Sequence, residues 1–161
     1  MDAPNGLPEI IAAFGDVHSY VDDSGQLSPA WNRQYLSVAE LPFPLALSWK
    51  PDVSVYKITC HRLLAQTFVD VFNEIKAEGL QDAVTQFGGC FNFRQQRHAT
   101  KLSTHAWGIA IDINPADNAQ GTIGSMEPGV VQAFRDAGFE WGGDWDMPRT
   151  DPMHFQFCTG Y

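Results

Sequence analysis

Apolar residues recur along this chain in the spacing of helices and in the alternation of strands. Between residues 61 and 79 they fall at steps of three and four, which predicts a helix with one buried face that Gly79 ends. Residues 7–14 predict a shorter helix. A third predicted helix begins after Pro128 and ends at Gly138.

Short segments rich in β-branched or aromatic residues are predicted to be strands, at 53–59, 90–94, 108–114 and 154–158. Residues 15–52 are rich in Gly, Pro, Asp and Ser, so we expect irregular structure with turns there. Helices mixed with strands that look antiparallel indicate an α+β fold, with a small antiparallel sheet packed with helices. Because no repeat or linker interrupts residues 1–161, we expect one domain, with an irregular N-terminal part at 1–52 and a catalytic core at 53–161.

Composition and charge exclude several classes of protein. The 161 residues are 44% apolar and 18% charged, as expected for a globular domain, and the apolar runs are too short for membrane insertion. The formal net charge is -9, which argues against nucleic-acid binding. The densest basic stretch, Arg94, Arg97, His98 and Lys101, is a small island that favours a site for an anionic group.

The start of the chain and its cysteines bear on the cellular compartment. The chain opens Met-Asp-Ala-Pro-Asn-Gly, without the pattern of a secretory signal peptide, so we expect synthesis in the cytoplasm and exit by another route, unless the sequence is trimmed. Cys60, Cys90 and Cys158 are odd in number and form no CxxC pair, which argues against a thiolate zinc site. We expect buried free thiols, with a Cys60–Cys90 disulfide as the alternative.

The predicted strand at 108–114 carries the first candidate for chemistry. Because side chains alternate along a strand, its three isoleucines share the core face, and Asp112 shares the other face with Gly108 and Ala110. These small neighbours leave space beside the carboxylate. Taken alone, an ion pair or a cap on the turn at Asn114 explains Asp112 equally well.

Two histidines complete a candidate ligand set. His154 lies on the polar face of the last predicted strand, and His105 comes just before the strand of Asp112. Two imidazoles and a carboxylate suit Zn²⁺, and three protein ligands leave a position for water, as in catalytic sites. Asp151 is the candidate general base, because Pro152 favours an extended Asp151 whose carboxylate turns back toward the metal. The alternative is that Asp151 forms a turn or orients an imidazole.

Two motifs carry a resemblance to a known family. Residues 103–112, Ser-Thr-His-Ala-Trp-Gly-Ile-Ala-Ile-Asp, fit the pattern S-x-H-x-x-G-x-A-x-D, and residues 151–154, Asp-Pro-Met-His, fit acid-x-x-His. Together they resemble the zinc D-alanyl-D-alanine carboxypeptidase family, which also contains bacteriophage L-alanyl-D-glutamate endopeptidases. The resemblance covers about residues 88–158 and implies a hedgehog/DD-peptidase-like fold.

The resemblance also implies roles for individual residues. It implies that His105, Asp112 and His154 bind zinc, and that Asp151 takes a proton from the attacking water and passes one to the leaving amine. It further implies an upstream arginine that polarises the scissile carbonyl. We assign this role to Arg94.

Four more residues are assigned to the substrate cleft. Arg97 is the alternative to Arg94 and a candidate substrate contact. Ser103 either touches substrate or orients the following loop. Trp141 and Trp145 are expected to wall the cleft, although core packing explains at least one of them more simply.

These assignments predict a zinc-dependent metallopeptidase that hydrolyses peptidoglycan stem peptides as a monomer at the cell wall. The absence of a signal-peptide pattern, the small size and Asp151 favour a lysin-like L-alanyl-D-glutamate endopeptidase of phage or prophage origin. A D-alanyl-D-alanine carboxypeptidase is the alternative. A non-catalytic, zinc-containing cell-wall-binding module is the alternative of another class.

Overall fold

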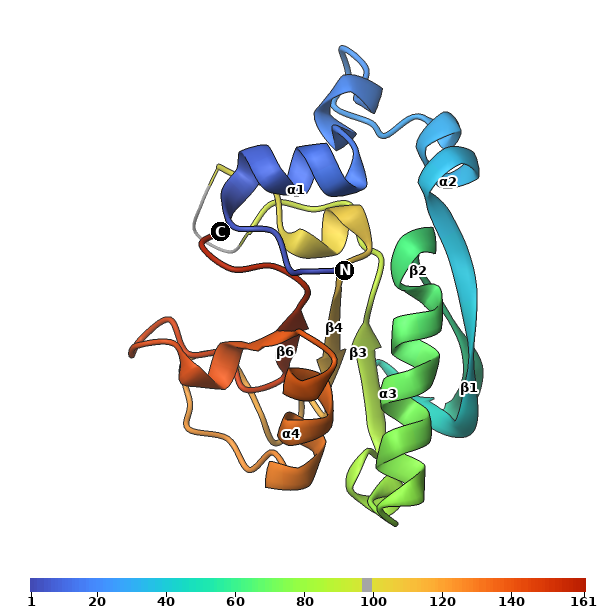
Figure 1. Cartoon of the computed structure of the whole chain (residues 1–161), viewed down its shortest axis with the longest axis vertical. Helices are drawn as coiled ribbons and strands as arrows, with labels where there is room; N and C mark the ends of the chain where they lie inside the picture. The colour runs from blue at the N-terminus through green and yellow to red at the C-terminus, as the bar shows by residue number, and fades with distance from the viewer. Residues whose placement is uncertain (97–99) are drawn as a thin grey trace.

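The computed structural model describes residues 1–96 and 100–161 (Figure 1). Its α-helices are α1 (Gly6–Phe14), α2 (Pro29–Tyr35), α3 (Ala65–Ala77) and α4 (Pro128–Asp136). Its strands are β1 (Leu36–Leu47), β2 (Lys50–His61), β3 (Gln86–Gly89), β4 (Ala110–Ile113), β5 (Glu140–Trp141) and β6 (His154–Gln156). Short 3-10 helices are η1 (Val17–Tyr20), η2 (Arg62–Leu64), η3 (Gln81–Ala83), η4 (Thr104–Trp107) and η5 (Gly142–Asp144). Within the described ranges no helix is both long and apolar enough to cross a membrane.

The strands form one sheet in the order β2-β1-β3-β4-β6-β5. Helix α3 packs on β1 and contacts α4, and Figure 1 shows both helices on one side of the sheet. The prediction of an α+β fold is confirmed, but the sheet is mixed rather than antiparallel. The chain passes from β1 through β2 and α3 before it reaches β3, and this crossover makes β3 parallel to β1.

The N-terminal part is more regular than the sequence indicated. Residues 15–52, which we expected to be irregular, contain α2 and most of the β1–β2 hairpin. Strand β1 is not recognisable from the sequence because it contains Pro42 and Pro44, and proline is unfavourable inside a sheet. Both prolines lie where the register with β2 shifts, between Glu40 and Leu45, and a bulge of this kind tolerates the missing amide donor.

The prediction of a strand at residues 90–94 is wrong. Strand β3 ends at Gly89, and the segment that follows is held by single backbone hydrogen bonds rather than by a strand ladder. The amide of Phe91 donates to the carbonyl of Thr59 at 3.2 Å, and that of Asn92 donates to the carbonyl of His105 at 3.0 Å. These bonds keep the segment beside η4.

The predicted helices are otherwise confirmed, with one shifted start. The helix expected at 61–79 begins at Ala65, because His61 still pairs with Leu36 in the sheet and its Nδ1 then accepts from the amide of Leu63 at 3.3 Å. Gly79, with φ 70°, follows its last turn as expected.

Helix α1 supports the 3-10 turn η4. Its C-terminal carbonyls are satisfied from distant segments: the carbonyl of Phe14 accepts from Nε2 of His61 at 3.1 Å, and that of Gly15 accepts from the indole of Trp107 at 2.9 Å. Burial lowers the pKa of His61 to about 4, so the ring is neutral near pH 7. The N-terminal residues therefore brace the loop that leads into β4.

The three cysteines are buried free thiols, as predicted. Burial raises the pKa of Cys60 and of Cys158 to about 12 in each case, which makes these thiols poor nucleophiles and poor thiolate ligands.

Replacing Gly108 with alanine is expected to destabilise the fold more than replacing Gly79. Both glycines adopt the left-handed backbone conformation, with φ 72° and φ 70°, and this conformation costs a residue with a Cβ about 1–2 kcal/mol. A Cβ at Gly108 would also lie 2.8 Å from the backbone nitrogen of His61, whereas one at Gly79 meets nothing within 4 Å. Urea unfolding of Gly108→Ala and Gly79→Ala measures the difference, and equal losses would contradict this packing argument.

Candidate metal centre and active site

Three side chains from separate elements converge beside the sheet: His105 from η4, Asp112 from β4 and His154 from β6. Nε2 of His105 lies 3.2 Å from Oδ1 of Asp112, and Nδ1 of His154 lies 3.0 Å from the same oxygen. The three atoms that would ligate a metal all lie within 4.8 Å of one another. The side chains are 2%, 13% and 7% exposed, respectively, so Asp112 is the most open to solvent.

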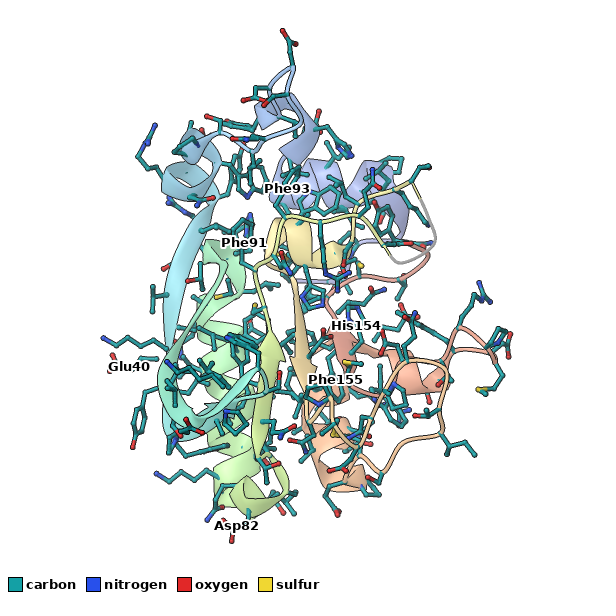
Figure 2. All side chains as sticks on the ribbon, turned by 180° about the vertical axis from the view of Figure 1, so that it is seen from behind. Glu40, Asp82, Phe91, Phe93, His154 and Phe155 are labelled. Carbon is teal, nitrogen blue, oxygen red and sulfur yellow. The ribbon has the colours of Figure 1, made fainter. Side chains whose placement is uncertain are left out.

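The pairing of β4 with β6 explains why these groups meet. Its antiparallel register places Asp112 opposite His154 and Ile111 opposite Phe155. Because side chains alternate, the two polar groups share one face while the apolar pair enters the core. Figure 2 shows His154 and Phe155 at successive positions of β6, where Phe155 stacks on Phe134 with ring centroids 4.2 Å apart.

The second nitrogen of each imidazole is already engaged. Nδ1 of His105 lies 2.7 Å from the carbonyl oxygen of Cys90, which can only accept, so this nitrogen carries the proton. Nε2 of His154 lies 3.1 Å from Oε1 of Gln156 and 3.3 Å from Oγ1 of Thr104. When each neutral ring donates through these contacts, the remaining lone pairs point at the carboxylate of Asp112.

This donor set fits a divalent cation. Two lone pairs that face a carboxylate repel it unless a positive charge lies among them. Either proton uptake by an imidazole or a bound metal supplies that charge. Hydrogen bonds from the outer nitrogens to carbonyl oxygens are typical of histidines that ligate metals, and two imidazoles with one carboxylate suit Zn²⁺.

The charges of the cluster are strongly coupled. Burial alone would raise the pKa of Asp112, but the charges and hydrogen bonds of His105 and His154 hold it well below its usual range. Burial alone would lower the pKa of His154, yet its hydrogen bond to Asp112 and the charges of Asp112 and Asp151 raise it. The site thus keeps its carboxylate ionised and favours positive charge beside it.

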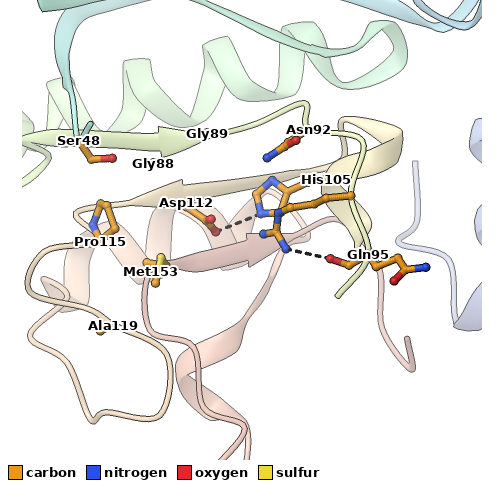
Figure 3. A pocket seen from close by; sticks show the side chains of 11 residues that line it. Ser48, Gly88, Gly89, Asn92, Gln95, His105, Asp112, Pro115, Ala119 and Met153 are labelled. Carbon is orange, nitrogen blue, oxygen red and sulfur yellow. Dashed lines mark hydrogen bonds and ion pairs between the residues drawn. The ribbon is translucent and has the colours of Figure 1, made fainter. Parts of the chain in front are cut away.

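Two adjoining pockets meet at this cluster, and both are lined by Arg94, Asp112 and Met153. The first pocket, about 530 Å³, appears in Figure 3 with the contact between His105 and Asp112. Its other lining residues are small or neutral, among them Ser48, Gly88, Gly89, Asn92, Pro115 and Ala119. The second pocket, about 1080 Å³, is more highly charged and includes Lys101, Glu140, Asp144, Trp145, Asp146 and Arg149.

Asp151 lies in the second pocket with His154. The two residues close a turn, in which the amide of His154 donates to the carbonyl of Asp151 at 3.0 Å, and the amide of Asp151 donates to Gly142 at 2.8 Å. A Cβ on Gly142 would approach the carbonyl oxygen of Asp151 to 2.5 Å. A glycine at this position is therefore what allows η5 to pack against Asp151.

Of the two candidate arginines, the structure describes one. Arg94 is partly buried and lines both pockets beside Asp112, and its guanidinium donates to the carbonyl of Gln95 at 3.3 Å. Arg97 lies outside the described residues. Arg94 is thus the arginine that the structure brings to the junction of the pockets.

The remaining candidates separate into two groups. Ser103 lines the second pocket, and it also caps η4, where its hydroxyl accepts from the amide of His105 at 3.4 Å. Trp145 lines the same pocket, with its ring centroid 5.5 Å from that of His154. Trp141 lines neither pocket: its indole donates to Pro152 at 2.8 Å, and its ring stacks on the core.

Sequence reasoning did not assign a role to several groups around the cluster. Alternation along the last predicted strand puts Gln156 on the same face as His154, but nothing in the sequence indicates the contact between the two side chains. Thr104, 2% exposed, reaches the same imidazole from η4. The Cys90 carbonyl is a backbone group, so no residue pattern marks it.

Comparison with known proteins agrees with this site. A family model described as D-alanyl-D-alanine carboxypeptidase matches residues 97–157. The matched segment contains His105, Asp112, Asp151 and His154 and begins after Arg94. The match supports the zinc peptidase family that the motifs resemble, and with it a hydrolase that acts on peptides. A search of curated proteins finds no match to the chain.

The stability that Asp112 confers on the metal-free protein is expected to peak between about pH 4 and pH 6.5. The lowered pKa of Asp112 gives stability that is present above its unfolded pKa and lost as the pH falls. The raised pKa of His154 gives stability that is complete below its unfolded pKa and lost as the pH rises through the folded value. Asp112→Asn removes the first contribution and the part of the second that comes from Asp112.

The measurement is the difference in free energy of unfolding between wild type and Asp112→Asn, with chelator present, across this pH range. A difference that is flat with pH, or that grows above pH 7, would contradict the charge pairing.

Proposed function

We propose that this protein is a zinc-dependent peptidase that hydrolyses peptidoglycan stem peptides as an L-alanyl-D-glutamate endopeptidase. The observation that carries the proposal is the convergence of three ligand atoms, with the outer nitrogens of both histidines engaged, at the junction of two pockets. We assign His105, Asp112 and His154 as the ligands. The family match supports the peptidase class, and the choice of bond is our inference.

Zinc, when bound, supplies a Lewis acid that polarises a carbonyl and lowers the pKa of water to about 7. The chain's own residues position the reactants around it. Asp151, beside His154 in the second pocket, accepts a proton from the attacking water and returns one to the leaving amine. Arg94, beside Asp112, donates hydrogen bonds to the oxygen that becomes negative as the carbonyl is attacked.

The two pockets support an endopeptidase over a carboxypeptidase. An endopeptidase must hold peptide on both sides of the scissile bond, and here the candidate ligands lie between a smaller pocket with few charged residues and a larger, more highly charged one. The segments before and after the bond would occupy one pocket each. Ser103 and Trp145 are our candidates for contacts in the second pocket. We keep Arg97 as a candidate from its sequence position alone.

The cleaved bond identifies the activity. We expect the zinc-loaded protein, incubated with purified peptidoglycan and with a defined stem pentapeptide, to release products with a new N-terminal D-Glu, detected by mass spectrometry. Loss of a single terminal D-Ala would replace the endopeptidase with a carboxypeptidase. Zinc binding without any cleavage would instead favour a non-catalytic cell-wall-binding module.

Asp151→Asn is expected to lower kcat about 10²- to 10⁴-fold, because the variant keeps the size of the side chain but removes the proton acceptor. Zinc content, measured by elemental analysis after dialysis, should stay at the wild-type level. Asp136→Asn, on the exposed face of α4, removes the same charge away from both pockets and serves as the control. Full activity in Asp151→Asn would exclude this residue as the base, and loss of zinc would identify it as a ligand.

A further inference from the structure

A chain of hydrogen bonds leads from His154 to a carboxylate on the neighbouring strand. Nε2 of His154 lies 3.1 Å from Oε1 of Gln156, and the amide nitrogen of Gln156 donates to Oε2 of Glu140 at 3.4 Å. The other oxygen of Glu140 accepts from the indole of Trp145 at 2.6 Å. We call the series Glu140, Gln156 and His154 the β5–β6 relay.

The direction of the bonds in this relay follows from the acceptors around the amide nitrogen of Gln156. An ionised carboxylate and a carbonyl oxygen only accept, so Glu140 requires the amide NH₂ of Gln156 to face it, and the carbonyl of Cys158, which accepts from the same nitrogen at 3.4 Å, favours the same orientation. The oxygen of Gln156 must then face His154, where it also accepts from the hydroxyl of Thr104 at 3.2 Å. A neutral His154 accordingly carries its proton on Nε2, which leaves Nδ1 to face Asp112.

Because the partners of His154 are buried, their donor and acceptor roles fix which imidazole nitrogen carries the proton. Gln156 and Thr104 are each 2% exposed, so little solvent reaches them to exchange one partner for another. The strand pairing places Glu140 directly opposite Gln156, and β5 is only two residues long. The main polar contribution of this short strand to the site is therefore to bring one carboxylate to the glutamine.

We propose that Glu140 is a positioning residue for the metal centre, acting through Gln156 to hold His154 with Nδ1 toward the metal. The inference rests on the proposed zinc site. The same carboxylate holds Trp145, whose ring lies 5.5 Å from that of His154 and lines the second pocket. Glu140 thus connects the orientation of a candidate ligand to one wall of the cleft.

The test measures zinc affinity by competition with a chromophoric chelator, and the coordinating nitrogen by ¹⁵N NMR of the histidine rings. Gln156→Leu removes the nearer acceptor for Nε2–H and leaves the hydroxyl of Thr104, and such outer partners are typically worth about 10- to 100-fold in metal affinity. Glu140→Gln, at a partly exposed position where misfolding is a smaller risk, should weaken binding less than Gln156→Leu. Asp146→Asn removes a charge from the same pocket without touching the relay and should keep wild-type zinc affinity.

The double variant shows whether Glu140 acts through Gln156. We expect Glu140→Gln with Gln156→Leu to bind zinc as weakly as Gln156→Leu alone. The relay would be overturned if the losses of zinc affinity in the two single variants added in the double variant, or if both single variants kept wild-type affinity. Coordination of zinc by Nε2 of His154 in the wild type would also overturn it. A wild type that binds no zinc would instead refute the proposed function itself.

Discussion

The antiparallel register between β4 and β6 is the constraint on which the candidate site depends. It places Asp112 opposite His154 on one face and Ile111 opposite Phe155 on the other, so that core packing and the polar cluster are fixed by the same pairing. A shift of β6 by one residue would turn His154 toward the core and Phe155 toward the cleft, and Asp112 would lose its partner. Because stacking of Phe155 on Phe134 opposes such a shift, the hydrophobic core also determines the geometry of the site.

Around this pair, the rest of the structure limits how each histidine can be oriented. The carbonyl of Cys90 holds His105 from one side, and the β5–β6 relay holds His154 from the other. Helix α1 contributes indirectly, since the carbonyl of Gly15, directly after its last residue, accepts from the indole of Trp107 at the end of η4. The result is a partly enclosed set of two imidazoles and one carboxylate, in which the outer nitrogen of each imidazole is already hydrogen-bonded. Both a metal site and electrostatic catalysis require such preorganisation.

The sequence predicted those parts of the protein whose pattern is local. Alternation in 108–114 and 154–158 identified the two strands of the site and the faces of Asp112 and His154, and three- and four-residue spacing identified α3 and α4. The sequence-based prediction failed where the residue pattern and the tertiary environment disagree. Phe91 and Phe93 alternate as in a strand, but they pack against the core from a segment that pairs with no strand. Strand β1 was not predicted because it contains two prolines. The link from Glu140 to His154 depends on strand pairing between distant segments, so no residue spacing could indicate it.

A crystal structure of the zinc-soaked protein, with anomalous data collected at the zinc absorption edge, tests the central claim most directly. Our account predicts one strong anomalous peak about 2 Å from Nε2 of His105, Nδ1 of His154 and a carboxylate oxygen of Asp112. A peak at another set of residues, or zinc bound through Nδ1 of His105 or Nε2 of His154, would contradict it.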